Sequence, residues 1–263
     1  MKGPGNPEPA VEIRNVTTRF GRSTVHDDVS LTIRRGEVFA LAGGSGSGKT
    51  TLLREMLLLQ KPSSGSIRLL GRDLAGLDEA GAESLHRRCG VLFQRGALFT
   101  AMTVEENVAA PLVEFTDLSK RLIRELAALK IALAGLPADS ASKYPNELSG
   151  GMRKRAAMAR AIANDPEILF LDEPSAGLDP VSASGLDELI LRLKDLLGLT
   201  VVMVTHDLDS LWRVADRVAV LGEGKILGSG TMEELCRSAD PVIRQYFHGP
   251  RGRAAREQSW NRK

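Results

Sequence analysis

Hydrophobic and polar residues follow two kinds of pattern along this chain. Residues 11–20 alternate between apolar and polar side chains, which predicts a strand with one buried face. A second strand is expected at 29–33. Short apolar runs bounded by Gly, Pro or polar residues predict further strands at 37–42, 66–70, 90–93, 168–171, 200–204 and 218–221.

Helical spacing of the apolar residues marks the segments between these strands. It predicts helices at 49–59, 104–113, 118–134, 150–164, 181–197 and 208–215. Three of the six fall in the middle of the chain, where there is little strand signal, so we expect a helical insertion at about 95–165. Strands and helices alternate again after it, which predicts a parallel sheet covered by helices.

Composition places the chain among globular proteins. Its 263 residues are 43% hydrophobic, yet no apolar run approaches the roughly 20 residues of a membrane span. The Gly- and Pro-rich start has no apolar signal segment, so we expect a cytosolic chain. Cys89 and Cys236 are far apart and lack metal-ligand spacing, which fits a structural role in a reducing compartment.

Charge is unevenly distributed. Residues 251–263 hold five basic residues and one acidic residue, a sum of +4, whereas the whole chain carries +2. The remainder is therefore about −2, which is a poor electrostatic match for a nucleic-acid backbone. For the basic tail, contact with anionic lipid, contact with a second copy of the chain and a solvated end all remain open.

A glycine-rich loop follows the strand at 37–42. Residues 43–50 read GGSGSGKT and match the phosphate-binding pattern G-x-x-x-x-G-K-[ST]. Backbone N–H groups of such a loop, together with the N-terminus of the next helix, surround phosphate oxygens. Lys49 can reach the β- and γ-phosphates, and the Thr50 hydroxyl can hold Mg²⁺. By itself this motif does not separate kinases, GTPases and transporters.

Two further motifs narrow the choice. The apolar strand at 168–171 ends in Asp172, which would face Mg²⁺, and Glu173, which can polarise a water molecule. Residues 148–152, LSGGM, begin a helix with small residues and so form a second anion site. One chain needs only one γ-phosphate site, so the second one makes sense if it closes on nucleotide held by another copy.

Taken together, these motifs resemble those of the nucleotide-binding subunits of ABC transporters, over about residues 11–240. In the family's order they are the phosphate loop, the Q-loop Gln94, the signature 148–152, the Walker B strand 168–172 with Glu173, the D-loop 175–179 and the switch His206. The signature departs from the commonest pattern only at Met152, where Gln is usual.

The resemblance implies a P-loop NTPase of the ABC type in the α/β class. Such a protein has a RecA-like parallel sheet core, an N-terminal antiparallel β subdomain and a helical subdomain insertion. Residues 1–249 would form the ATPase domain, with the helical subdomain at about 95–165, and residues 250–263 a basic tail.

The resemblance also implies a mechanism in which two copies enclose two ATP molecules, each with Mg²⁺. Catalysis would rest on Glu173, His206, Gln94 and Lys49, and Mg²⁺ would be held by Thr50, Gln94 and Asp172. The nucleotide-binding residues implied are Phe20, Gly43, Gly44, Ser45, Gly46, Ser47, Gly48, Lys49, Thr50, Thr51, Ser149, Gly150, Gly151 and Asp179. Phe20 would stack on adenine, although a Phe in the core of a strand is an alternative.

Two stretches are similar to the MlaF group of Mla/Mce-type phospholipid transporters. They are residues 96–100, GALFT, taken with the SGGM of the signature, and residues 240–249, DPVIRQYFHG. This similarity implies an MlaE-like permease, an MlaD-like Mce-domain protein and possibly a small accessory protein as partners. The chain would then work at the cytoplasmic face of the inner membrane and energise lipid transport.

Two alternatives remain open from the residues. The motor of an importer for amino acids or other polar solutes shares every catalytic motif. A soluble ABC ATPase acting on DNA or ribosomes is a remote alternative, because the chain has neither the long coiled coil nor the second ATPase domain of those proteins.

Overall fold

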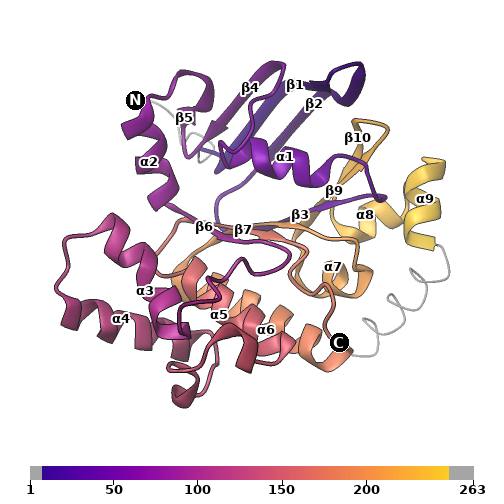
Figure 1. The fold of residues 1–263 in the computed structure, drawn as a ribbon. Helices are drawn as coiled ribbons and strands as arrows, with labels where there is room; N and C mark the ends of the chain where they lie inside the picture. Colours follow the sequence, from indigo (N-terminus) through magenta and orange to yellow (C-terminus); the bar gives the residue numbers. More distant parts are fainter. Residues whose placement is uncertain (1–7, 249–263) are drawn as a thin grey trace, which may run out of the picture. The chain divides into compact units, whose positions relative to one another are not determined.

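The structure is a computed structural model that describes residues 8–248 (Figure 1). It divides into two compact units. We call residues 1–85 with 200–263 the sheet unit, and residues 86–199 the helical unit. None of the described helices is long and apolar enough to cross a bilayer.

The sheet unit begins with an antiparallel sheet whose strand order is β2-β1-β4-β5. Its strands are β1 (Val11–Phe20), β2 (Ser23–Ile33), β4 (Ser64–Leu69) and β5 (Arg72–Asp73). Alternation along β1 is interrupted at Asn15, which has a φ of 50° and lies in a register shift of the β1–β2 pair. The strand predicted at 29–33 starts earlier, at Ser23, because the charged run around Asp27 and Asp28 hides its alternation.

The other strands of the sheet unit follow the order β10-β9-β3-β8. They are β3 (Val38–Ala42), β8 (Thr200–Val204), β9 (Arg217–Gly222) and β10 (Lys225–Gly230). Strand β3 pairs in parallel with both β8 and β9, and all residues of β3 and β8 are buried, as expected for parallel strands. The predicted parallel sheet is therefore confirmed, whereas the antiparallel edge strand β10 was not predicted.

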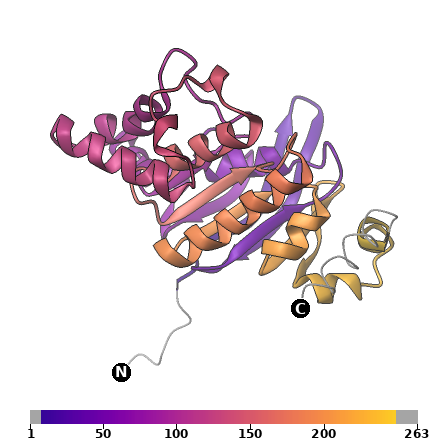
Figure 2. The ribbon, with the colours of Figure 1, turned by 90° about the horizontal axis from the view of Figure 1, so that it is seen from below.

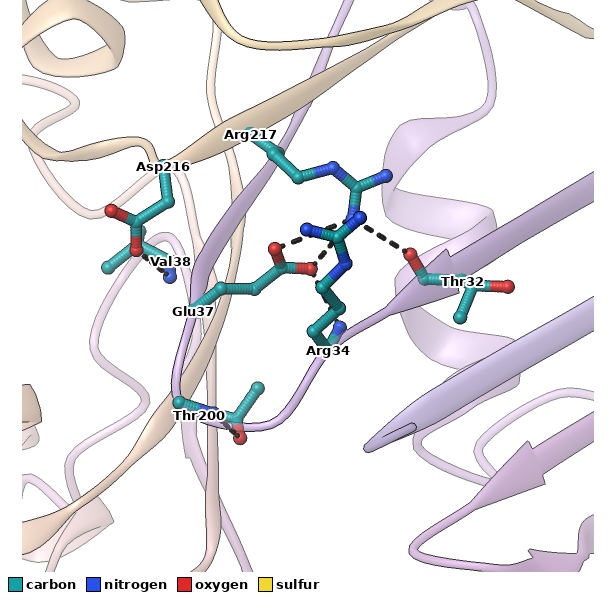
Figure 3. A network of polar contacts seen from close by, with 8 residues as sticks. Thr32, Arg34, Glu37, Val38, Thr200, Asp216 and Arg217 are labelled. Atoms are coloured by element: carbon teal, nitrogen blue, oxygen red, sulfur yellow. Dashed lines mark hydrogen bonds and ion pairs between the residues drawn. The ribbon is translucent and has the colours of Figure 1, made fainter. Parts of the chain in front are cut away.

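A polar network of the sheet unit lies where β3 begins (Figure 3). The Arg217 guanidinium donates to Glu37 Oε1 (3.0 Å) and to the Thr32 carbonyl (3.3 Å), and it lies over the Phe39 ring. Glu37 also accepts the Arg34 N–H (2.7 Å). The Glu37–Arg217 pair thus joins the end of β2, the turn into β3 and the start of β9. Because the Glu37 carboxylate is satisfied by its partners, this buried charge is tolerated.

Helices of the sheet unit are short. They are α1 (Lys49–Met56), α2 (Glu79–Arg87), α7 (Leu208–Val214), α8 (Met232–Cys236) and α9 (Pro241–His248), with α2 ending just beyond the unit. Helices α1 and α7 confirm predicted segments, and α1 ends three residues before the predicted position. In Figure 1, α1 runs beside the antiparallel sheet, and it contacts β4.

The helical unit contains one parallel strand pair, β6 (Cys89–Leu92) with β7 (Ile168–Asp172). Its helices are α3 (Val104–Phe115), α4 (Lys120–Leu133), α5 (Gly150–Ala161) and α6 (Pro180–Leu197). Figure 2 shows α3, α4 and α5 gathered together, and their buried side chains form one core that includes Val108, Ile131 and Ala156. The predicted helices at 118–134 and 150–164 are present but slightly shorter.

The predicted basic tail, 250–263, lies outside the described residues. The subdomain boundaries expected from the resemblance, including the helical subdomain at 95–165, stay predictions.

Candidate functional site

The phosphate loop connects β3 to α1, and close packing fixes its backbone at two glycines. Gly43 has a φ of 145°, and a Cβ there would overlap the Leu221 carbonyl. Gly48 has a φ of 99° and caps α1, and a Cβ there would lie 2.7 Å from His26 Nε2. These backbone conformations are rare for residues with a side chain, so the loop requires glycine at both places.

Lys49 starts α1 and is buried, with 7% of its surface exposed. Its ammonium donates to the carbonyl oxygens of Gly43 (2.9 Å) and Gly44 (2.7 Å), which holds the positive charge across the loop. Thr50 and Thr51 follow in the first turn of the helix, both half-buried. The dipole of α1 adds positive potential at the same end.

Phe20 and His206 also belong to the sheet unit. Phe20 ends β1 with 51% of its surface exposed, which excludes a place in the core and leaves the ring face available for stacking. His206 is exposed in the short connection between β8 and α7. The next residue, Asp207, caps α7 by accepting the Asp209 N–H (3.0 Å), which fixes the backbone beside the histidine.

In the helical unit, Asp172 ends β7 with 7% of its surface exposed, and Glu173 follows it half-buried. Glu173 has a φ of 47°, a left-handed conformation that costs energy for a residue with a side chain. Its carbonyl accepts the Ala176 N–H (3.2 Å) in the turn that follows.

The signature segment forms the start of α5. Ser149 is the N-cap, and its hydroxyl accepts the Met152 N–H (3.2 Å). Gly150 and Gly151 are the first helical residues. As glycines they have no side chain that could cover their own N–H groups. The predicted helix N-terminus is therefore present, with the backbone donors that an anion needs.

Asp179 caps the other long helix, α6. Its carboxylate accepts the Val181 N–H (3.1 Å) and the Ser182 N–H (3.0 Å). Hydrogen bonds from Ser182, and more weakly from Val181, lower the pKa of the Asp179 carboxyl. Asp179, the aspartate of the D-loop, is therefore the N-cap of α6.

Lys154 is a residue that the sequence analysis did not single out. It projects from α5, is 6% exposed, and donates to the carbonyl oxygens of Gln94 (2.5 Å) and Glu173 (3.3 Å). Burial lowers the pKa of the Lys154 ammonium, and the carboxylates of Asp172 and Glu173 oppose that shift. Only the folded chain brings these three segments together, so no sequence signal marks Lys154. Gln94 itself is exposed.

The segment after Gln94 is held by two side chains. Arg160 donates to the carbonyls of Gly96 (2.9 Å) and Ala97 (2.6 Å) and lies over the Phe99 ring. Asn107, fully buried, accepts the Phe99 N–H (2.8 Å) and donates back to its carbonyl (3.0 Å). Hydrogen bonds therefore hold the loop backbone, yet the loop exposes 54% of Phe99 and 38% of Met102.

The expected Mg²⁺ ligands fit that ion chemically. Thr50, Gln94 and Asp172 offer a hydroxyl, an amide carbonyl and a carboxylate, the hard oxygen donors that Mg²⁺ prefers. Among residues 8–248, no group of three or more His, Cys, Asp or Glu side chains is placed so that it could hold a metal ion. Mg²⁺ in nucleotide sites needs few protein ligands, because phosphate oxygens and water complete its shell.

The structure therefore places the predicted residues in two groups. Phe20, residues 43–51 and His206 belong to the sheet unit, where the 43–51 loop joins β3 to α1. Gln94, residues 149–151, Asp172, Glu173 and Asp179 belong to the helical unit. Lys154 brings the Gln94 and Glu173 backbones together.

Fold and motifs define an ATP-hydrolysing cassette of the ABC class. The family described as "ABC transporter" matches residues 26–176, more than half of the chain, so the chain belongs to this family. A solved dimeric cassette, MJ0796 in a post-hydrolysis state bound to ADP and Pi, is 32% identical with a TM-score of 0.77. It covers 84% of this chain and 98% of its own.

Relatives include the "Intermembrane phospholipid transport system ATP-binding protein MlaF" of Haemophilus influenzae. It is 38% identical over 239 residues, 91% of this chain and 90% of the relative. The "Probable ribonucleotide transport ATP-binding protein mkl" of Mycobacterium bovis is 40% identical over 92% of this chain and 67% of its own length.

Proposed function

We propose that this chain is the ATPase subunit of a membrane transporter for phospholipid or a related lipid. The observation that carries the proposal is the 38% identity to MlaF over nine-tenths of both chains. The GALFT sequence at 96–100 and the SGGM signature are also similar to those of the MlaF group. As a peripheral subunit, the chain would bind the cytoplasmic side of a permease.

ATP would be handled as follows. The loop 43–51 holds the phosphates, with Lys49 at the β- and γ-phosphates, and Phe20 stacks on adenine. Thr50, Asp172 and Gln94 hold Mg²⁺, which when bound neutralises charge that develops on the phosphates. Glu173 accepts a proton from the attacking water, and His206 contacts the γ-phosphate.

A second copy would complete each site. The N–H groups at the start of α5, together with Ser149, form an anion site that one chain does not need for its own nucleotide. In a homodimer this site closes on the γ-phosphate held by the other copy, with Asp179 close to the same interface. The dimeric state of the related MJ0796 cassette supports this arrangement.

Permease docking is assigned to the loop 95–103. Arg160 and Asn107 fix its backbone, while Phe99 and Met102 expose apolar surface that a partner helix can cover. Phe99→Ala with Met102→Ala is expected to reduce co-purification of the permease while ATP binding persists. Leu129→Ala, at an equally exposed apolar residue of α4, is the matched control. Equal recovery of permease by both variants would contradict this docking site.

Glu173→Gln tests the chemistry. The variant keeps the shape of the side chain but removes the base, so turnover is expected to fall by about 10²–10⁴ while ATP binding persists. The trapped nucleotide should also stabilise a dimer on size exclusion. Wild-type turnover in this variant would overturn the role of Glu173.

Cargo is tested by purifying the tagged chain from native membranes in mild detergent and identifying its partners by mass spectrometry. A multi-span permease with an Mce-domain protein, with or without a small accessory protein, supports the lipid transporter. The mkl relative favours a second candidate, a polar-solute transporter. Recovery of a solute-binding protein with another permease would favour that candidate and contradict lipid transport.

A further inference from the structure

A buried polar network lies directly behind the phosphate loop, within the sheet unit. It consists of His26 on β2, Thr18 on β1 and Glu55 on α1, each no more than 1% exposed. Thr18 and His26 face each other as register partners across the two strands. Three separate segments therefore place polar side chains in an otherwise apolar core, at a cost that only mutual hydrogen bonding offsets.

His26 connects this network to the loop. Its Nε2 lies 3.1 Å from the Gly48 carbonyl oxygen, and its Nδ1 lies 3.0 Å from Thr18 Oγ1. Thr18 Oγ1 lies 2.5 Å from Glu55 Oε1, within hydrogen-bond distance. Glu55 Oε2 is 3.4 Å from His26 Nδ1, an ion-pair distance without hydrogen-bond geometry.

The atoms in contact determine how many protons the network holds. A carbonyl only accepts, so His26 Nε2 must carry a hydrogen to bond Gly48. If Thr18 donates to an ionised Glu55, then Nδ1 must donate to Thr18, which makes His26 an imidazolium. If Glu55 is protonated instead, it donates to Thr18, and Thr18 donates to Nδ1.

Both arrangements hold the same number of protons, one more than a neutral imidazole and a carboxylate together. In either arrangement the network is electrically neutral as a whole, so neither places a net negative charge behind a loop that binds phosphates. Without His26, the Glu55 carboxylate would be a buried and nearly unpaired charge.

Gly48 is the point at which this network acts on the nucleotide site. Its carbonyl accepts both His26 Nε2 and the Leu52 N–H (2.9 Å), which closes the first turn of α1. The ring also occupies the space that a Cβ at Gly48 would need. Lys49 and Thr50 follow directly, so the orientation of this peptide sets where both side chains begin.

We propose that His26 is a positioning residue for ATP binding, acting through Gly48 as part of a shared-proton network with Thr18 and Glu55. The inference rests on the phosphate-loop site assigned above and adds residues that are outside the nucleotide-binding motifs. Its role is to fix the entry of α1, not to touch the nucleotide.

The deciding variant is the double substitution His26→Leu with Glu55→Leu. It replaces both charged groups by apolar side chains, a change that often leaves stability unaltered or improves it. Its dissociation constant for Mg-ATP, measured on the purified full-length chain with a fluorescent analogue, is expected to rise about tenfold, or about 1.4 kcal/mol. Thermal unfolding of the same sample shows whether the fold is retained.

Glu37→Leu with Arg217→Leu is the matched control. It removes a part-buried ion pair of the same unit, at the opposite end of β3 from the loop, and is expected to change melting temperature without changing affinity. His26→Gln keeps an N–H donor for Gly48 and is expected to restore part of the affinity that His26→Leu loses.

The possible outcomes are distinguishable. Weak binding by the folded double variant, with normal binding by the control, supports the proposal. If the folded double variant binds with wild-type affinity, the proposal is overturned and His26 is a packing residue. The same holds if the control variant binds as weakly as the double variant. If the double variant does not fold, the affinities of His26→Gln and His26→Leu for Mg-ATP are compared instead. Tighter binding by His26→Gln supports the proposal, and equal affinity overturns it. Failure of the wild-type chain to bind Mg-ATP would instead count against the proposed function.

Discussion

The phosphate loop of the sheet unit and the proposed catalytic loops of the helical unit are held in place by different means. In the phosphate loop, Gly43 and Gly48 pack so closely against their neighbours that no side chain fits. In the helical unit, long basic side chains of α5 donate to backbone carbonyls, most of which lie in loops. These are Arg153 to Leu148, Lys154 to Gln94 and Glu173, Arg155 to Ala134 and Gly185, and Arg160 to Gly96 and Ala97.

The difference has a mechanical meaning. A closely packed backbone has no alternative arrangement at low energy, because its atoms cannot approach their neighbours more closely. Hydrogen bonds from a flexible Lys or Arg side chain can break and re-form, and each is worth about 1.5–3 kcal/mol. We therefore expect the phosphate loop to be intolerant of substitution and the helical-unit loops to be adjustable.

Gly48→Ala should have the largest effect. The methyl group would lie 2.7 Å from His26 Nε2 and 2.9 Å from Val25 Cγ1, in a backbone conformation that disfavours alanine. Affinity for Mg-ATP is expected to fall by about 10- to 100-fold, which titration calorimetry can measure. Gly44→Ala, with no atom within 4 Å of the added methyl, should lose much less. Equal losses would show that steric packing does not define this loop.

Lys154→Met comes next. The substitution keeps the aliphatic stem and removes the donor to Gln94 and Glu173, so the catalytic backbone loosens while the phosphate loop is untouched. We expect kcat to fall about tenfold with little change in nucleotide affinity. Lys143→Met is the control, since it removes only the exposed Asp139 ion pair (2.7 Å) and should leave kcat unchanged. A weakened affinity with normal kcat would contradict the positioning role of Lys154.

Arg160→Leu should have a smaller and more selective effect. It releases the Gly96 and Ala97 carbonyls and the Phe99 ring, which lie in the proposed docking loop. Basal ATPase activity is expected to stay within about twofold, while the stimulation of activity by a reconstituted permease falls by several fold. Arg121→Leu, which removes an exposed helical ion pair with Glu125, serves as control. If the permease stimulates the ATPase activity of Arg160→Leu as strongly as that of the wild type, this loop does not couple the ATPase to the permease.

Asp179→Asn should have the smallest effect. Asn keeps an oxygen that caps α6 but loses the charge, so only the charge-dependent part of the cap disappears. The pKa of Asp179 is lowered in the folded chain, so its ionised form stabilises the fold at pH values above the unfolded pKa of about 4. That contribution is lost as pH falls through the lower, folded pKa. The melting-temperature difference between wild type and variant should therefore shrink in acid.

Much of this organisation was visible in the sequence, because chemistry tied to local motifs is also local in structure. Residues 43–50 are found between a buried strand and a helix, and the signature starts a helix, as predicted. Elements without such motifs were missed. Strand β10 contains Gly228 and Gly230 and reads as a loop, although pairing with β9 stabilises it.

Long-range polar contacts could not be predicted either. His26 lies in a run with two exposed aspartates, so its sequence context suggests a surface residue, yet it is fully buried. Its partners Thr18 and Glu55 come from a strand and a helix whose packing fixes the contact. For Lys154 the same holds, since its acceptors lie 60 and 19 residues away.

Helix α5 has one consequence for how this chain can vary. Its basic side chains reach several separate segments of the helical unit. Lys154 and Arg160 both donate to the segment 94–97, Lys154 also donates to Glu173, and Arg155 donates to the end of α4 and to Gly185 within α6. Inserting one residue near Met152 would rotate everything after it by about 100° and move it about 1.5 Å along the axis. Lys154, Arg155 and Arg160 would then miss their acceptors together. Length changes within α5 should therefore be inactivating, whereas many single substitutions on its surface remain tolerable.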